Sequence, residues 1–275
     1  MANPFQDFLS TAVDAVKQAG KLALSMQAGL REIRYKGEKD LVTEADLACD
    51  KVVRSLLSTA HPDHNIVTEE AGPVNHGSEY TWFVDPIDGT VNYSRGFPLW
   101  GVSVGLRQGR AMVAGAIFLP ALKELYTATL GGGACLNGKP IAASRVELLS
   151  QAIISHGDFN VGDTDSARED LNRKNFLARM RTASALQRVK CLGSAVLECA
   201  FVAAGRMDAY CMVAMKPWDV AVGGLLVTEA GGGASALDGR PFSIDGPDAL
   251  FSNWILHEKL LTLLRSEDPE GAGGA

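Results

Sequence analysis

The hydrophobic pattern of the first sixty residues predicts two amphipathic helices. Between residues 5 and 28 apolar residues recur at intervals of three and four, which places them on one helical face: Phe5, Phe8, Leu9, Ala12, Val13, Val16, Ala19, Ala23 and Met26. We expect a second helix to begin after Thr43, with Thr43 as its N-cap and Asp46 in the capping-box position. The buried face of that helix would comprise Leu47, Val52, Val53, Leu56 and Leu57.

The pattern then changes to short apolar runs, which are typical of strands. We expect strands over 65–68, 80–84, 101–106, 112–118, 124–129 and 134–136. Gln108-Gly109 would close a hairpin, and Asn137-Gly138 is a strong turn signal. The strand over 80–84 is expected to stop within five residues, because Pro86 and Gly89 follow it.

The second half of the chain alternates between strand-like and helix-like segments. Strands are expected over 152–155, 188–191 and 207–212, and helices over 166–180, 194–204 and 220–230. Alternation of this kind predicts a layered α/β arrangement. We expect a single structural domain with an N-terminal α+β lobe (1–145), a C-terminal α/β lobe (146–268) and a frayed tail (269–275) rich in Gly and Ala.

Composition narrows the class of protein. The chain has 275 residues, 47% of them hydrophobic, and a net charge of -6, which argues against a nucleic-acid polymer as partner. Its five cysteines are scattered and show no C-x-x-C spacing, so free thiols in a reducing compartment are expected rather than zinc or disulfides. Neither a secretory signal nor a membrane-spanning run is recognisable, and a cytoplasmic globular protein is expected.

The segment from Asp85 to Thr90 delivers two carboxylates and a hydroxyl to one short stretch of chain. Asp85 and Asp88 flank the expected turn, and carboxylates held that close repel each other unless a cation lies between them. Oxygen ligands of this kind suit Mg²⁺ or Mn²⁺ rather than zinc. The alternative is an Asp-rich turn stabilised by its own Asx hydrogen bonds.

Further acidic residues lie at places where α/β proteins build sites. Glu69-Glu70 follows a predicted strand, Asp46 lies in the first turn of a predicted helix, and Asp219 begins another helix after Trp218. Each also has a structural interpretation, since acids cap helices and glutamates border solvated loops. His61 and His64 have a spacing that can bind zinc, but they lie in a polar loop and we do not favour a metal site there.

Taken together, these motifs resemble those of the inositol monophosphatase family, within the larger group of metal-dependent, lithium-sensitive sugar phosphatases. The resemblance extends from about residue 5 to about residue 264 and implies a layered αβαβα sandwich. The segments that carry it follow the family's order: DLVTEAD (40–46), Glu69-Glu70, WFVDPIDGT (82–90) with Asn92 and Phe97-Pro98, Gly193-Ser194-Ala195, and WDVAVGGLLVTEAGG (218–232).

The resemblance implies a set of metal ligands. Glu69, Asp85 and the backbone carbonyl of Ile87 would bind a first, catalytic Mg²⁺. Asp85, Asp88 and Asp219 would bind a second, and Glu69 would also touch a third. The implied cofactor is therefore two or three Mg²⁺ ions, with Mn²⁺ as a substitute.

The resemblance also implies catalytic and substrate-binding roles. Thr90 and Asp46, with Glu69, would orient the attacking water and help to deprotonate it, so that hydrolysis is direct and forms no phosphoenzyme. Such chemistry needs cations, because a phosphate dianion repels a nucleophile, and helix N-termini supply further N–H donors. The implied phosphate- and substrate-binding positions are Asp88, Gly89, Thr90, Gly193, Ser194, Ala195, Met212 and Asp219.

The sequence departs from the family at Met212, where inositol monophosphatases carry a glutamate that binds inositol hydroxyls. A thioether accepts such bonds poorly, so inositol phosphate is one candidate among several. Fructose 1,6-bisphosphate, histidinol phosphate, NADP(H) and 3′-phosphoadenosine compounds stay open. Lys190 or Lys216 would meet a second anionic group, and Lys36 or Lys39 would approach the phosphate or face solvent.

Two alternatives to a phosphatase are a noncatalytic, metal-binding regulatory member of the family and an unrelated divalent-ion buffer. Retention of the implied ligands, Thr90 and Asp46 argues against the first, and the lack of an EF-hand loop argues against the second. The expected partner is a small phosphorylated metabolite, without nucleic-acid polymer or membrane. The resemblance further implies a homodimer.

Overall fold

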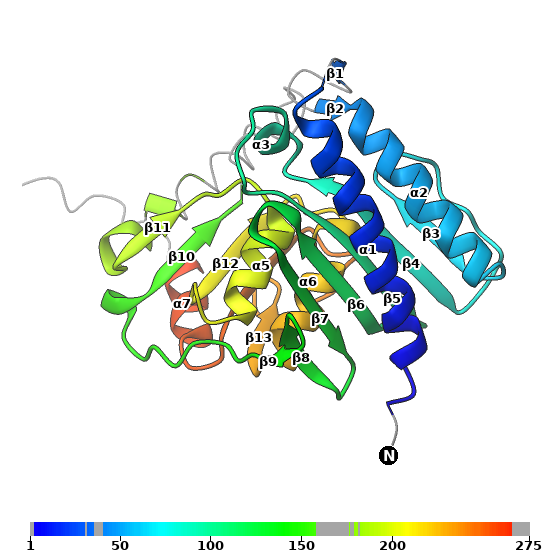
Figure 1. Cartoon of the computed structure of the whole chain (residues 1–275). Helices are drawn as coiled ribbons and strands as arrows, with labels where there is room; N and C mark the ends of the chain where they lie inside the picture. Colours follow the sequence, from blue (N-terminus) through cyan, green and yellow to red (C-terminus); the bar gives the residue numbers. More distant parts are fainter. Residues whose placement is uncertain are drawn as a thin grey trace, which may run out of the picture.

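Two β-sheets organise the computed structural model, which describes residues 3–30, 32–35, 41–157, 176, 179–180 and 182–265 (Figure 1). The larger sheet has seven strands in chain order: β3 (Asn65–Thr68), β4 (Tyr80–Asp88), β5 (Gly101–Gln108), β6 (Ala111–Leu119), β7 (Glu124–Thr129), β8 (Gly133–Leu136) and β9 (Lys139–Pro140). The smaller has the order β11 (Arg188–Lys190), β10 (Ile153–His156), β12 (Ala209–Val213), β14 (Asp248–Asn253) and β13 (Gly232–Ser235). A separate pair joins β1 (Ile33–Tyr35) to β2 (Leu41–Thr43).

Helical layers and the two sheets alternate, which gives five layers in all (Figure 1). The helices α1 (Gln6–Gln27) and α2 (Glu44–Ala60) pack on one face of the seven-stranded sheet. The pair α5 (Ala195–Ala203) and α6 (Pro217–Glu229) fills the space between the two sheets, and α7 (His257–Arg265) covers the outer face of the smaller one. The order confirms the αβαβα sandwich. No described helix is long and apolar enough to cross a membrane.

The first two helices match the pattern from which they were predicted, except at Leu47. That residue is exposed rather than buried, because the buried face of α2 is centred on Ala45, Cys49, Val53 and Leu57. Within α1 the side chains of Ala12, Val16 and Ala19 are fully buried. The second helix begins at Glu44, and its cap is the expected one: the Thr43 hydroxyl accepts from the Asp46 amide at 3.4 Å. The Asp46 carboxylate accepts in return from the Thr43 amide at 2.9 Å. The capping box is therefore confirmed, and it fixes Asp46 at the start of a buried helix.

The strand β4 stops within five residues of Val84, as predicted, but it is longer than expected because Pro86 does not end it and it continues to Asp88. Pairing with β5 continues from Asp85, opposite Ser103, to Asp88, opposite Gly101, across a bulge. The bulge places Pro86 where no ladder N–H is needed, so the proline is tolerated. The strand ends only at Gly89, whose φ of 85° is accessible to glycine. Both aspartates therefore lie on a bulged strand end rather than on a turn.

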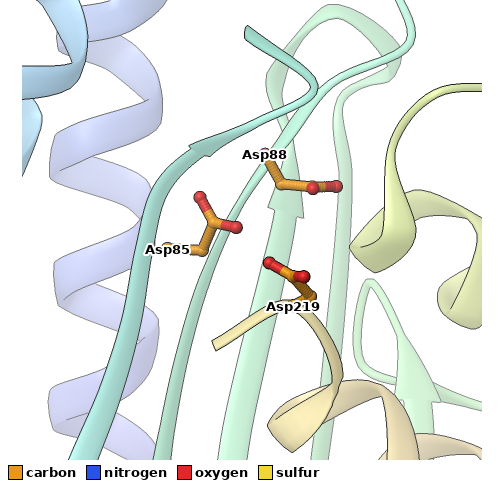
Figure 2. A group of neighbouring side chains, drawn as sticks. All are labelled: Asp85, Asp88 and Asp219. Carbon is orange, nitrogen blue, oxygen red and sulfur yellow. The ribbon is translucent and has the colours of Figure 1, made fainter. Parts of the chain in front are cut away.

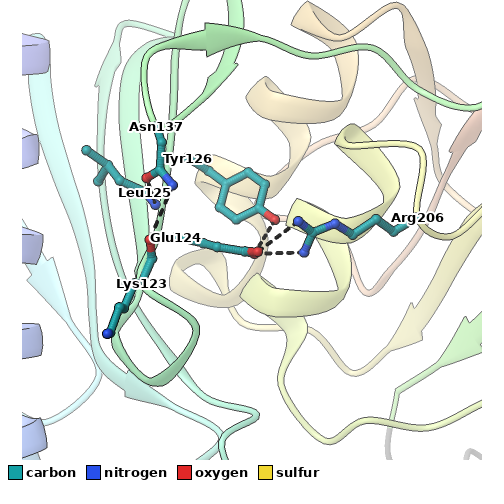
Figure 3. A network of polar contacts seen from close by, with 6 residues as sticks. All are labelled: Lys123, Glu124, Leu125, Tyr126, Asn137 and Arg206. Carbon is teal, nitrogen blue, oxygen red and sulfur yellow. Dashed lines mark hydrogen bonds and ion pairs between the residues drawn. The ribbon is translucent and has the colours of Figure 1, made fainter.

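Most other predicted strands agree with the structure, and both predicted turns are present. Asn137 and Gly138 have positive φ values of 50° and 76°, the conformation of a tight hairpin turn. The Asn137 side chain also accepts from the Leu125 amide at 2.9 Å (Figure 3). No element was predicted at β1, β2, β9, β13, β14, α7, the short helix α3 (Thr90–Ser94) or the 3₁₀ turns Pro120–Leu122 and Leu149–Gln151. The helix expected over 166–180, residues 36–40 and the tail lie wholly or mostly outside the described residues.

The position of α6 depends on a pair of glycines beneath it. Gly105 and Gly115 face each other across β5 and β6. A Cβ at Gly105 would lie 2.6 Å from the Val222 side chain, and one at Gly115 would lie 2.8 Å from it. Only residues without a side chain allow α6 to approach the sheet this closely. The glycine pair thereby sets the position of Asp219 in the first turn of α6.

A partly exposed ion pair joins β7 to the chain between α5 and β12 (Figure 3). Arg206 donates two hydrogen bonds of 2.8 Å to the Glu124 carboxylate, and the Tyr126 hydroxyl donates a third at 2.7 Å. Burial alone would raise the pKa of Glu124, but the hydrogen bonds from Arg206 and Tyr126 outweigh burial and lower it. The ion pair therefore links β7 of the larger sheet to the segment that connects α5 with β12 of the smaller sheet.

We expect Gly115→Ala to lower the free energy of unfolding by about 1–3 kcal/mol, because the new methyl group would displace Val222 and with it α6. Chemical denaturation measures the change. The matched control is Gly72→Ala, where nothing lies within 4 Å of the added atom. Equal stability of the two variants would contradict the close approach of α6.

We expect Glu124→Gln to destabilise the protein by about 1 kcal/mol at about pH 7 and by less at about pH 3. The folded pKa of Glu124 lies below its unfolded value. Its stabilising contribution is therefore complete above the unfolded pKa and is lost as the pH falls through the folded pKa. Urea denaturation at both pH values tests this, with the exposed Glu147→Gln as control. A pH-independent difference would show that charge is not involved.

Candidate metal centre

Three carboxylates converge at the edge of the larger sheet (Figure 2). Asp85 and Asp88 come from the bulged end of β4, and Asp219 comes from the first turn of α6. One oxygen from each lies within 4.8 Å of the other two. Asp85 is only 1% exposed, whereas Asp88 and Asp219 are half-buried. The structure thus brings together three of the positions that the sequence singled out.

Burial and mutual repulsion make this cluster unfavourable without a counter-charge. Burial raises the pKa of Asp85 well above its usual range, and the charges of Glu69, Asp88 and Asp219 raise it further. The pKa of Asp219 is raised by burial and then by Asp88. Burial also raises the pKa of Asp88, to about 6, against the opposing effect of its hydrogen bonds. Such a group is stabilised by a cation placed among the oxygens.

Two of the three carboxylates are held by neighbouring chain. Asp219 accepts from the Lys216 amide at 3.0 Å, which fixes it at the start of α6. Asp88 accepts from the Val196 amide at 3.0 Å and from the Ser194 hydroxyl. The N-terminus of α5 therefore faces Asp88, where its positive end favours a negative charge.

Asp85 differs from its neighbours, because its Oδ1 atom is buried and has no hydrogen-bond partner among the described residues. An orphaned buried carboxylate oxygen is costly unless a cation or water meets it. All three clustered ligand atoms are carboxylate oxygens, with no histidine or cysteine in the group. The donor set and the orphaned oxygen both fit Mg²⁺ or Mn²⁺.

A second polar group lies directly beside the cluster. The Thr90 hydroxyl lies 3.1 Å from Asp46 Oδ1 and 3.1 Å from the Ile87 carbonyl oxygen. Asp46 is fully buried and also accepts from the amide and the hydroxyl of Thr43. Burial raises the pKa of Asp46, while these hydrogen bonds lower it. The two residues expected to act as a pair are thus in direct contact, although they are 44 positions apart.

The two glycine segments expected to bind phosphate also meet. A Cβ at Gly89 would lie 3.1 Å from the Gly193 carbonyl and 3.1 Å from the Ser194 Cβ, so the loops are in close contact. Asn92 reinforces the junction by donating to the carbonyl of Leu192 at 2.7 Å. The Ser194 hydroxyl, in the segment expected to bind substrate, donates to Asp88 and caps α5.

The remaining predicted positions lie farther from the three clustered oxygens. Glu69 follows β3 and is outside the cluster of three, yet its charge contributes to the raised pKa of all three aspartates. Met212 lies half-buried on β12 opposite Ala249, and its described contacts are with the core. Lys216 is exposed and is the N-cap residue of α6, and Lys190 is exposed on β11. Lys36 and Lys39 lie outside the described residues.

Sequence reasoning missed two polar residues near the site. Ser103 pairs with Asp85 across the β4–β5 ladder, and its buried hydroxyl has no described hydrogen-bond partner. Glu198 is buried in α5, and its carboxylate accepts hydrogen bonds from the Leu192 amide at 2.9 Å and from the Ser155 hydroxyl. The available signal for Glu198 was a lone charge within an apolar helix, which implies a partner.

Comparisons with known proteins agree with this geometry. The model of the "Inositol monophosphatase family" matches residues 5–268. The chain is 39% identical over 265 residues to an "Inositol monophosphatase" from Dictyostelium discoideum, covering 94% of each chain. It is 34% identical over 235 residues to a "Fructose-1,6-bisphosphatase/inositol-1-monophosphatase" from Aquifex aeolicus, covering 85% of each.

The structural comparison leads to the same family. The inositol monophosphatase of Anabaena (Nostoc) superposes with a TM-score of 0.82 at 33% identity, over 94% of this chain and 96% of that one. A family match across nearly the whole chain, with relatives above 30% identity, settles the relationship. The chain belongs to the inositol monophosphatase family.

Proposed function

We propose that this protein is a Mg²⁺-dependent phosphomonoesterase that hydrolyses the phosphate ester of a small sugar or polyol. The observation that carries the proposal is the cluster of three carboxylates with an orphaned Asp85 oxygen, beside the Thr90–Asp46 pair. A phosphatase of the inositol monophosphatase type needs both parts: anionic ligands for cations and a polar pair for water.

The proposed ligands are Asp85, Asp88 and Asp219, with Glu69 and the Ile87 carbonyl completing the set. They would hold two or three Mg²⁺ ions, for which Mn²⁺ could substitute. When bound, the ions neutralise the phosphate oxygens, lower the pKa of water and stabilise the leaving oxygen. The orphaned oxygen of Asp85 supports its assignment, because it is a buried acceptor without a hydrogen-bond partner among the described residues.

The proposed role of Thr90 is to orient the attacking water. Its hydroxyl donates to Asp46 Oδ1, which leaves the lone pairs of Thr90 Oγ1 to accept a hydrogen from water. Asp46 is held in place by Thr43, so it fixes the direction of the Thr90 hydroxyl and can receive its proton as water attacks. The two residues would thereby position a water molecule beside the carboxylate cluster.

We assign phosphate binding chiefly to the amides of Gly89 and Thr90. The first amides of α5 are engaged by Asp88, so the N-terminus of α5 stabilises that carboxylate rather than binding phosphate directly. Gly89 is suited to a close approach of substrate, because it has no side chain and a φ of 85°. Gly193, Ser194 and Ala195 then position Asp88 and border the substrate.

The substrate is best sought among several phosphate esters. The relative from Aquifex aeolicus carries a double name that includes fructose 1,6-bisphosphatase, and Met212 stands where a glutamate would bind inositol. The exposed Lys216, three residues before Asp219, favours a second candidate class, the bisphosphates. The resemblance also makes a homodimer our expectation, to be tested by sedimentation.

The decisive experiment is phosphate release from a panel, with and without Mg²⁺. The panel comprises inositol 1-phosphate, fructose 1,6-bisphosphate, histidinol phosphate, NADP⁺ and 3′-phosphoadenosine 5′-phosphate. We expect release that depends on Mg²⁺ from at least one of them. Binding of Mg²⁺ without hydrolysis of any would support the noncatalytic alternative instead.

We expect Asp85→Asn to stabilise the metal-free protein, because it removes a charge that burial and the neighbouring carboxylates of Asp88 and Asp219 disfavour. The same substitution should abolish the stabilisation by Mg²⁺. Thermal unfolding with chelator and with Mg²⁺ measures both effects, and the exposed Asp14→Asn is the control. A variant that Mg²⁺ stabilises as much as wild type would exclude Asp85 as a ligand.

We expect Thr90→Ala to lower kcat about 100-fold or more while leaving KM nearly unchanged, because the substitution removes the hydroxyl assigned to water and retains the backbone amide assigned to phosphate. Thr90→Ser retains the hydroxyl and should recover most of the loss. Steady-state kinetics on the best panel substrate separates the two parameters. An effect on KM alone would make Thr90 a substrate-binding residue.

A further inference from the structure

A cavity of about 640 Å³ lies away from the carboxylate cluster, on the far part of α6. Its walls come from the β5–β6 hairpin, the second half of α6 and the segment 241–245. The α6 residues that line it begin at Gly224, more than one helical turn beyond Asp219. Its volume lies within the range of small-molecule sites and is too small for a folded partner.

Two arginines give this cavity a positive charge. Arg107 and Arg110 both line it, against a single carboxylate from Asp245. Arg110 is exposed and has no hydrogen bond or ion pair with the described part of the chain. It is therefore available to an anion from solution.

Arg107 is held in place but incompletely satisfied. Its guanidinium lies 4.9 Å from the centre of the Phe83 ring and donates one hydrogen bond, of 3.2 Å, to Asp245. Its Nε is buried without a hydrogen-bond partner among the described residues. A guanidinium has five N–H donors, so further acceptors can be accommodated. The Arg107 side chain is nevertheless 23% exposed, so an anion in the cavity would meet its outer N–H groups rather than the buried Nε.

Another part of the lining is apolar and closely packed. Phe242 packs so closely on α6 that a Cβ at Gly224 would lie 2.5 Å from its ring, and it stacks edge-on against Phe251 with ring centres 5.1 Å apart. Leu130 lines the same cavity and is 46% exposed, although it is a large apolar residue. The apolar wall is thus preformed, and a ligand would cover side chains that water now meets.

We propose that this cavity is a second ligand site, which binds a small organic anion with an apolar body. A carboxylate, sulfonate or phosphate group would face Arg110 and Arg107, where charge-assisted hydrogen bonds are strong. The body would lie against Phe242, Leu130 and Leu225. None of these residues belongs to the proposed metal centre, so the site stands or falls independently of the phosphatase activity.

The test uses 8-anilinonaphthalene-1-sulfonate, whose fluorescence rises on binding to an apolar wall. We expect Arg110→Gln to weaken its binding about 5- to 10-fold by removing one charged hydrogen bond. Ala111→Trp, at an exposed position lining the cavity, should block the site and abolish this binding. Arg145→Gln, an exposed arginine outside the cavity lining, should leave binding unchanged.

A neutral probe separates the charge from the apolar contact. N-phenyl-1-naphthylamine has the same rings without the sulfonate, so Arg110→Gln should change its affinity less than about 2-fold, whereas Ala111→Trp should still block it. Thermal unfolding establishes that each variant is folded. Binding of the sulfonate to both cavity variants with wild-type affinity would overturn the proposal, as would equal losses of the charged and the neutral probe in Arg110→Gln.

Discussion

The close packing of α6 on the larger sheet forces Asp219 towards Asp85 and Asp88, and the resulting repulsion among three carboxylates constrains everything around them. Glycines at 105 and 115 permit this approach. Without a counter-charge the arrangement opposes folding, because the same burial that positions the carboxylates also raises their pKa values. The three carboxylates therefore lower the stability of the metal-free fold at a place where apolar side chains would stabilise it.

The surrounding chain relieves that repulsion unevenly. Asp88 accepts hydrogen bonds from a hydroxyl and an amide at the start of α5, and Asp219 accepts one from the Lys216 amide. Asp85, the most deeply buried of the three, keeps an oxygen without a partner. The unmet acceptor lies where the family resemblance implies a metal, beside the Thr90–Asp46 contact. Chemistry and stability are thus linked at one residue.

The sequence predicted those parts of the structure that depend on local pattern. The amphipathic helices, the Thr43 capping box and the Asn137-Gly138 turn each follow from neighbouring residues, and the layered fold follows from their order. The end of β4 was misjudged, because a bulge that accommodates Pro86 depends on pairing with β5. The bond from Ser194 to Asp88 joins residues 106 positions apart, and no local pattern reveals it. Family resemblance supplied the candidates, and packing determined which of them meet.

Crystallography of the protein with Mn²⁺ tests the central claim most directly, because anomalous scattering locates that ion without reference to activity. The account predicts an anomalous peak in direct contact with the carboxylates of Asp85, Asp88 and Asp219, with the orphaned oxygen of Asp85 as a ligand. Crystals soaked in Mn²⁺ that show no anomalous peak at this cluster, or a peak only elsewhere, would contradict the assignment.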